Sequence, residues 1–260
     1  MRENFLTFGS PEICEEEIAE VVDTLRSGWI GTGPKVGAFE EAFKQYVGAE
    51  HAIAVSSCTA ALHLSMIVSG VGPGDEVITT PMTFCATANA IVHTGAKPVF
   101  VDICEDGNID PQKLEAAINS RTRAVMPVHL TGRPAKMAEI LEIARQHDLF
   151  VLEDAAQALG ASLDGKTVGS WGHAAAFSLH PLKNLHAIGD GGMVTSQNSD
   201  LIALLAKSRN HGLEGRERCE FWSFNNRLDE MQAALLRVQL RHLQEALRSH
   251  DIDRLQLMFL

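Results

Sequence analysis

A lysine and an aspartate each follow a short segment of small or apolar residues. Lys183 lies between residues 177–180 and the glycine-rich turn 189–192, and Asp154 ends the segment 151–154, which begins with Val151 and Leu152. A buried lysine can form an imine with the aldehyde of pyridoxal phosphate. An aspartate at the carboxyl end of a strand can pair with the ring nitrogen and keep it protonated, so that the ring accepts electrons. The two residues therefore predict a pyridoxal phosphate centre.

The rest of the chain alternates between short apolar strands and amphipathic helices that must position this centre. We expect strands at 52–55, 76–79, 98–101, 123–128, 149–152, 174–178 and 193–195, and helices at 59–69, 84–93, 111–118 and 134–147. A long amphipathic helix follows near the end. Continuous apolar strands indicate a sheet covered on both faces. The repetition of strand and helix predicts an α/β fold with a mostly parallel sheet and helices in layers on both sides.

The first 48 residues predict two helices joined by an irregular loop at 29–34. Ser10, Pro11 and Glu12 are typical of a helix start, and Gly28 of a helix end. The apolar face of the first helix would consist of Ile18, Val21, Val22 and Leu25. That of the second would consist of Val36, Phe39, Phe43 and Val47.

Composition limits the classes of function. The chain has 260 residues, 45% of them hydrophobic, which suits one large domain with a core. The net charge of 22 − 33 = −11 disfavours non-specific binding to nucleic acid or to anionic membranes. Five cysteines without a Cys-x-x-Cys pair predict neither a disulfide framework nor a metal site. No signal peptide or spanning segment is visible, so we expect a cytoplasmic protein.

Several ordered motifs give the chain a resemblance to a known family. They lie at residues 27–34, 55–63, 74–79, 127–132, 153–157, 177–184 and 225–234. Together they resemble the sugar aminotransferases of the DegT/DnrJ/EryC1/StrS type, which are fold-type I pyridoxal phosphate enzymes. The resemblance runs from about Phe5 to about Val238. It implies a three-layer large domain similar to that of aspartate aminotransferase.

The resemblance also implies a domain division. Residues 1–238 would form the cofactor-binding large domain with an N-terminal arm, and residues 239–260 the truncated start of a C-terminal region. Members of the family continue into a smaller domain that covers the active site, and we expect this domain to be absent here. A truncated, non-catalytic family member is therefore one alternative.

Most of the expected site residues come from the resemblance. Lys183 would hold the cofactor and move a proton, and Asp154 would pair with the ring nitrogen. Thr59, Ala60 and Ser178 would bind the phosphate, the first two at a helix N-terminus. Gln157 would contact the phenolic oxygen, and Phe84 would stack on the ring. Helix capping by Asp154 or Thr59, a surface role for Gln157 and a core role for Phe84 are the alternatives.

A partner subunit is expected to complete the site. The resemblance implies a homodimer in which the loop 29–34 and residues 225–227 reach the neighbouring active site. Asn225 or Arg227 would then contact the phosphate. Arg227 could instead hold the carboxylate of the amino donor, or pair with Asp229.

The implied reaction is transamination of a nucleotide-linked keto sugar, with an amino acid such as glutamate as donor. Some family members are dehydratases with histidine in place of the lysine, so a sugar dehydratase is a second alternative. The glycine-rich turns do not match Gly-x-Gly-x-x-Gly, which argues against a dinucleotide site. We expect the histidines to be structural, with His129 and His180 as candidates for the wall of the site.

Overall fold

The computed structural model describes residues 11–249; the predicted arm before residue 11 and the tail after residue 249 lie outside the described residues. Seven strands form one sheet. Their spatial order is β1 (His51–Val55), β9 (Gly192–Ser196), β8 (Ala174–Ser178), β5 (Phe150–Asp154), β4 (Thr122–Val125), β2 (Glu76–Thr79) and β3 (Lys97–Phe100). β9 runs antiparallel to both β1 and β8, and the other neighbouring pairs are parallel. The predicted mostly parallel sheet is confirmed.

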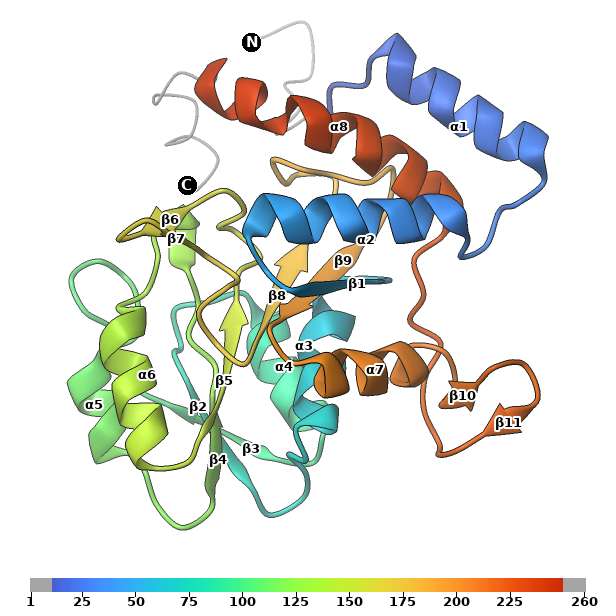
Figure 1. The fold of residues 1–260 in the computed structure, drawn as a ribbon. Coiled ribbons are helices and arrows are strands. Elements are labelled where there is room, and N and C mark those ends of the chain that lie inside the picture. Colours follow the sequence, from blue (N-terminus) through green and yellow to red (C-terminus); the bar gives the residue numbers. More distant parts are fainter. Residues whose placement is uncertain (1–10, 250–260) are drawn as a thin grey trace, which may run out of the picture.

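Helices cover both faces of this sheet (Figure 1). One face carries α2 (Pro34–Val47), α5 (Pro111–Ala116), α6 (Met137–Gln146) and α8 (Glu230–Ser249); the other carries α3 (Cys58–Val68), α4 (Cys85–His93) and α7 (Ser199–Ser208). The alternation of side chains along β5 shows this division, because Val151 packs with α6 and Leu152 packs with α3. The three-layer prediction is also confirmed.

Several short elements lie outside the main sheet. Two small hairpins are formed by β6 (Ser162–Leu163) with β7 (Lys166–Thr167) and by β10 (Leu213–Glu214) with β11 (Arg218–Cys219). A 3-10 turn, η1 (Leu130–Gly132), follows β4. Helix α8 continues without interruption through Val238, the position at which the sequence analysis divided the chain.

The first helix differs from its prediction. α1 (Glu15–Ser27) begins after Cys14 rather than at Pro11, because the Glu17 carboxylate accepts the Cys14 N–H at 2.5 Å in a capping box. Its apolar face is exposed, with Ile18 46% and Leu25 51% accessible.

The reason is the position of α1 outside the layered core, against α8 (Figure 1). Its polar side makes the contacts. Glu16 pairs with Arg241 of α8 at 2.5 Å, and Glu20 pairs with Lys35 of α2 at 2.9 Å. The apolar side therefore lies in solvent.

Helix α2 is held by a carboxylate from a distant part of the chain. Gly33 occupies its N-cap position and has no side chain to offer. The buried Glu230 accepts the N–H groups of Lys35 at 2.5 Å and of Val36 at 3.1 Å instead. A carboxylate is favourable there because it meets the positive end of the helix. This contact fixes the start of α8 against α2.

Candidate active site

The predicted residues gather at the carboxyl edge of the sheet. Asp154 ends β5 and Ser178 ends β8, and the residues that end β1 and begin β9 lie beside them, since Val55 and Ser178 are both register partners of Gly192. Ligands of open α/β sheets bind at this edge. Gly192 is required for the close approach, because a Cβ there would lie 2.4 Å from the carbonyl carbon of Ser57. β9 therefore touches the backbone that leads into α3.

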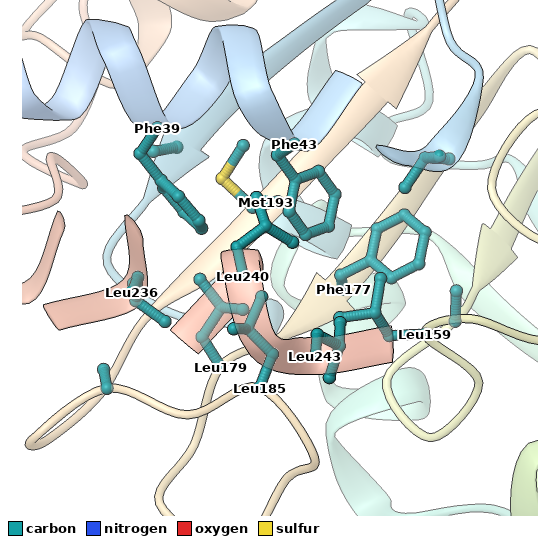
Figure 2. Packing of buried hydrophobic residues seen from close by; sticks show 14 of the residues in the cluster. Phe39, Phe43, Leu159, Phe177, Leu179, Leu185, Met193, Leu236, Leu240 and Leu243 are labelled. Atoms are coloured by element: carbon teal, nitrogen blue, oxygen red, sulfur yellow. The ribbon is translucent and has the colours of Figure 1, made fainter. Parts of the chain in front are cut away.

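Lys183 lies on the loop between β8 and β9. The loop is closed at its base by two hydrogen bonds, from Leu179 N–H to Gly191 O at 2.9 Å and from Ala187 N–H to Leu179 O at 2.8 Å. Leu179 and Leu185 pack with Leu240 and Leu243 of α8 in the cluster shown in Figure 2. Two apolar side chains of the loop are thus buried on either side of the lysine.

Two glutamines of α8 hold the same loop. The Ile188 N–H donates to Gln232 Oε1 at 2.8 Å, and the His186 N–H donates to Gln239 Oε1 at 2.9 Å. The two glutamines are seven residues apart, which places them on one side of a helix. The sequence analysis did not single them out, although this spacing on an otherwise apolar helix face was a visible signal.

Asp154 is buried and has defined partners. Thr87 Oγ1 of α4 donates to Asp154 Oδ2 at 2.7 Å, and the Ala156 N–H donates to Oδ1 at 3.2 Å. Burial raises the pKa of Asp154, while the Thr87 and Ala156 hydrogen bonds and the charge of Lys183 act in the opposite direction. Thr87 was missed by the sequence analysis, since a threonine inside a helix carries no distinctive signal.

Asp154 and Lys183 are close enough to influence each other. Burial lowers the pKa of Lys183, and the nearby Cys58 and Asp154 partly oppose this. Burial and the Asp154 charge raise the pKa of the Cys58 thiol well above its usual value. A lysine amine with a lowered pKa is a better nucleophile, as imine chemistry requires.

The expected phosphate end differs in detail from its prediction. α3 begins at Cys58, and Ser57 rather than Thr59 is its N-cap. The Ser57 hydroxyl accepts the Ala60 N–H at 3.1 Å. Thr59 lies in the first turn, where backbone N–H groups lack intrahelical partners. The Ser178 hydroxyl lies across Gly192 from this turn and is partly accessible.

Gln157 lies in polar surroundings, and Phe84 is exposed. Gln157 Oε1 accepts the Thr131 N–H at 2.8 Å, so the carbonyl end of its amide is engaged. Its NH₂ group is the end left to donate to a ligand oxygen. Phe84 is the N-cap residue of α4 and is 73% exposed, so the alternative of a core role does not apply.

The loop 29–34 and residues 225–227 lie together beside the end of β1, where the Ser56 N–H donates to Asn226 O at 3.0 Å. Thr32 Oγ1 donates to Leu228 O at 2.9 Å, and a pocket of about 470 Å³ lies between the two segments. Its lining comprises Gly31, Thr32, Ala206, Arg209, Asn210, Arg227 and Asp229. Lys183 and Asp154 are not among these residues.

Asn225 and Arg227 of the second segment are exposed. Arg227 Nη1 donates to Asn210 Oδ1 at 2.6 Å, so its partner in this structure is not Asp229. Asn225 is exposed and forms a backbone bridge with Asn210.

The two candidate wall histidines have different roles. His129 is fully buried; its Nδ1 accepts the Ala135 N–H at 3.0 Å, so Nε2 carries the proton and donates to Glu153 at 2.9 Å. His129 is therefore structural. His180 is exposed, and its Nδ1 accepts the Leu182 N–H at 3.2 Å in the turn that leads to Lys183.

The residues present fit pyridoxal phosphate. A buried carboxylate suits a protonated pyridine nitrogen, and a desolvated lysine amine suits the aldehyde. A helix N-terminus beside a serine hydroxyl suits a phosphate. All three groups lie at one edge of the same sheet.

Comparison with known proteins agrees with this arrangement. The sequence profile of the DegT/DnrJ/EryC1/StrS aminotransferase family matches residues 11–255. The chain belongs to the DegT/DnrJ/EryC1/StrS aminotransferase family. It is 48% identical over 255 residues to the spore coat polysaccharide biosynthesis protein SpsC of Bacillus subtilis, and this match covers 98% of the chain and 65% of SpsC. It is 40% identical to GDP-perosamine synthase of Caulobacter vibrioides, covering 95% of the chain and 67% of that enzyme. The resemblance stated from the motifs is confirmed.

Solved members of the family have the same fold. S. venezuelae DesV, solved with a ketimine intermediate, superimposes with a TM-score of 0.86 at 44% identity, covering 88% of this chain and 62% of DesV. The sugar aminotransferase Spr1654 of Streptococcus pneumoniae in its PLP form superimposes with a TM-score of 0.87 at 32% identity, and the match covers 92% of this chain and 67% of Spr1654. The predicted family cofactor, pyridoxal phosphate, is confirmed. The chain spans about 65% of the length of SpsC.

Proposed function

We propose that this chain carries the cofactor-binding half of an enzyme that transfers an amino group from an amino acid to a nucleotide-linked keto sugar. The observation that supports this most strongly is that the desolvated Lys183 and the buried Asp154 lie close enough at the carboxyl edge of the sheet for their charges to influence each other. GDP-perosamine synthase, a relative, is named for a nucleotide sugar, and SpsC for polysaccharide synthesis. The first name favours a nucleotide sugar as acceptor, and we propose glutamate as the amino donor.

Each residue has a defined task in this proposal. When bound, pyridoxal phosphate supplies an electron-accepting ring for the amino transfer. Lys183 Nζ attaches the cofactor and then moves a proton at the reacting carbon. Asp154 balances the charge of the ring nitrogen, Gln157 donates its NH₂ group to the phenolic oxygen, and Phe84 covers the ring. Thr59, Ala60 and Ser178 bind the phosphate.

A second copy of the chain would complete the site. Arg227 and Asn225 are exposed beside the pocket at Gly31 and Thr32. In a homodimer this surface would reach the partner's cofactor, where Asn225 or Arg227 would bind the phosphate. Arg227 could equally hold the carboxylate of the amino donor in a bidentate pair. The cytoplasmic location remains a prediction from the sequence.

The alternatives differ in what they release and what they change. Lysine rather than histidine at position 183 favours amino transfer over sugar dehydration. A dehydratase would release water or ammonia without converting the cofactor to its amine. A non-catalytic chain would bind the cofactor and leave it unchanged in the presence of every amino donor.

The test is the visible absorption spectrum of the purified chain with pyridoxal phosphate, before and after glutamate is added. We expect a band from the lysine-bound cofactor that glutamate converts to the amine form. Lys183→Ala should abolish the band, and Lys97→Ala, at a side chain that is 72% exposed, should not. A band that survives Lys183→Ala would contradict the proposal.

A further inference from the structure

The hydroxyl groups of Thr83 and Thr87 form a short chain that ends on the Asp154 carboxylate. Thr83 Oγ1 lies 2.7 Å from Thr87 Oγ1, and Thr87 Oγ1 lies 2.7 Å from Asp154 Oδ2. Thr83 lies in the bend before Phe84, the N-cap of α4, and Thr87 lies in the first turn of that helix. This series of hydrogen bonds connects the start of α4 to the end of β5.

The direction of donation follows from the number of protons. An ionised carboxylate only accepts, so the single proton of Thr87 must go to Asp154. Thr83 must then donate its own proton to Thr87. The second hydrogen bond polarises the first and strengthens it.

The surroundings make these two hydrogen bonds important for the charge of Asp154. Thr87 is fully buried and Asp154 is 4% exposed. The titratable groups that face the carboxylate are Cys58 from α3, His129 after β4 and Lys183 after β8. Burial favours the neutral acid, and the Thr87 hydroxyl is the strongest of the contacts that favour the carboxylate.

We propose that Thr87 is a positioning residue that keeps Asp154 ionised and correctly oriented toward the ring nitrogen of the cofactor, with Thr83 as its support. Asp154 Oδ1 is also held, by the Ala156 N–H at 3.2 Å, so both oxygens are fixed. This inference rests on the proposed function, because it concerns the same cofactor. It assigns a role to two residues outside the set expected from the sequence.

Loss of the Thr87 hydroxyl has a defined consequence. Asp154 Oδ2 loses a buried donor, so the neutral acid becomes more favourable. A neutral Asp154 stabilises a protonated ring nitrogen less well. We expect Thr87→Val to lower the pKa of the bound ring nitrogen by about one unit, which is about a tenfold change in its protonation equilibrium. Cofactor binding should weaken by a similar factor.

The experiment follows the ring nitrogen directly. The chain is loaded with ¹⁵N-labelled pyridoxal phosphate, and the nitrogen chemical shift is titrated against pH by NMR. The variants are Thr87→Val, Thr87→Ser and Thr83→Val. The matched control is Thr79→Val, because Thr79 is also buried but donates to Met126 O at 2.8 Å rather than to Asp154.

The expected order of effects is specific. Thr87→Val should shift the titration by about one unit, Thr83→Val should shift it less and in the same direction, and Thr87→Ser should restore it. Thr79→Val should leave it unchanged even if the protein is less stable. If Thr87→Val does not fold, the comparison of Thr83→Val with Thr79→Val decides, and equal titrations overturn the proposal.

Failure of this inference is distinguishable from failure of the proposed function. A protonated nitrogen in the unmodified chain together with an unchanged titration in Thr87→Val overturns only the role of Thr87. An unmodified chain that does not hold the cofactor through Lys183, or whose nitrogen is unprotonated at neutral pH, overturns both.

Discussion

The carboxylates of Glu153 and Asp154 lie on opposite faces of the central sheet, although the two residues are adjacent in the chain. Side chains alternate along a strand, so Asp154 faces α3 and α4 while Glu153 faces the other layer. Glu153 accepts the N–H groups of Gly169, Trp171 and Gly172 at 2.8–2.9 Å. One carboxylate therefore stabilises the fold, and the other faces the proposed cofactor.

We expect Glu153→Gln to destabilise the protein by about 2–3 kcal/mol, since an amide NH₂ would replace an acceptor oxygen in a fully buried site. Urea unfolding measures this. Glu142→Gln is the control, because Glu142 is exposed and makes only local contacts with Arg145 and Gln146. Equal stability of the two variants would show that Glu153 does not support the loop 169–172.

Asp154→Asn should have opposite effects on stability and on cofactor binding. The folded-state pKa of Asp154 is raised by burial, so the charged carboxylate opposes folding near neutral pH. Unlike the backbone donors to Glu153, the Thr87 hydroxyl can rotate and accept from the new amide NH₂. Without cofactor, the variant should unfold at a temperature a few degrees higher, since 1 kcal/mol corresponds to about 2–4 °C for a chain of this size. It should also lose the visible band of bound pyridoxal phosphate. A lower Tm in the variant would contradict this account.

Lys183 should give stability a distinct pH dependence. Its folded-state pKa lies below 10.5, so between these two values the unfolded state binds more protons and stability rises with pH. In Lys183→Met this contribution should be absent. The measurement is urea unfolding without cofactor at several alkaline pH values. If the free energy of unfolding changes with pH in the same way for both proteins, this role of Lys183 is refuted.

The two glutamines of α8 should matter for holding the cofactor. Gln239→Ala removes the acceptor of the His186 N–H, and Gln232→Ala removes that of Ile188. We expect each variant to bind pyridoxal phosphate about 3–10-fold more weakly, as loss of one hydrogen bond of about 1 kcal/mol predicts. Amide hydrogen exchange at His186 and Ile188 should accelerate. Gln244→Ala, at an exposed position of the same helix, is the control, and it should change neither quantity.

Gly192→Ala should strongly destabilise the protein, because the new methyl group has no room. The new Cβ would lie 2.4–2.7 Å from the backbone of Ser57 and Cys58, and neither can move without displacing the start of α3. We expect a loss of about 1–3 kcal/mol and much weaker phosphate binding. Gly37→Ala, at an open, exposed helical position, should instead stabilise by about 0.5–1 kcal/mol. The pair can be compared by thermal unfolding and cofactor titration.

The sheet and the positions of Lys183 and Asp154 could be predicted because they depend on local apolar segments and a distinctive set of motifs. The sheet strands at 174–178 and 193–195, on either side of Lys183, were expected from sequence and lie where predicted. The exposed face of α1 could not be predicted, because an apolar stripe indicates an amphipathic helix but not its neighbour.

Contacts between residues far apart in the sequence could not be predicted either. The Glu230 cap of α2 joins residues almost two hundred positions apart, and the Thr87–Asp154 hydrogen bond joins residues 67 apart. Local propensity carries no information about such pairs. The same holds for the Gln232 and Gln239 contacts, which depend on how α8 crosses the lysine loop.

The reversed direction of β9 determines how the reactive amine is held. A parallel strand in that place would need a long crossover, usually through a helix, whereas an antiparallel strand returns at the same edge and leaves Lys183 on a closed loop. The location of the amine is thus set by the pairing of β8 with β9. Inserting one residue in β9 would exchange its inward and outward side chains and move the lysine.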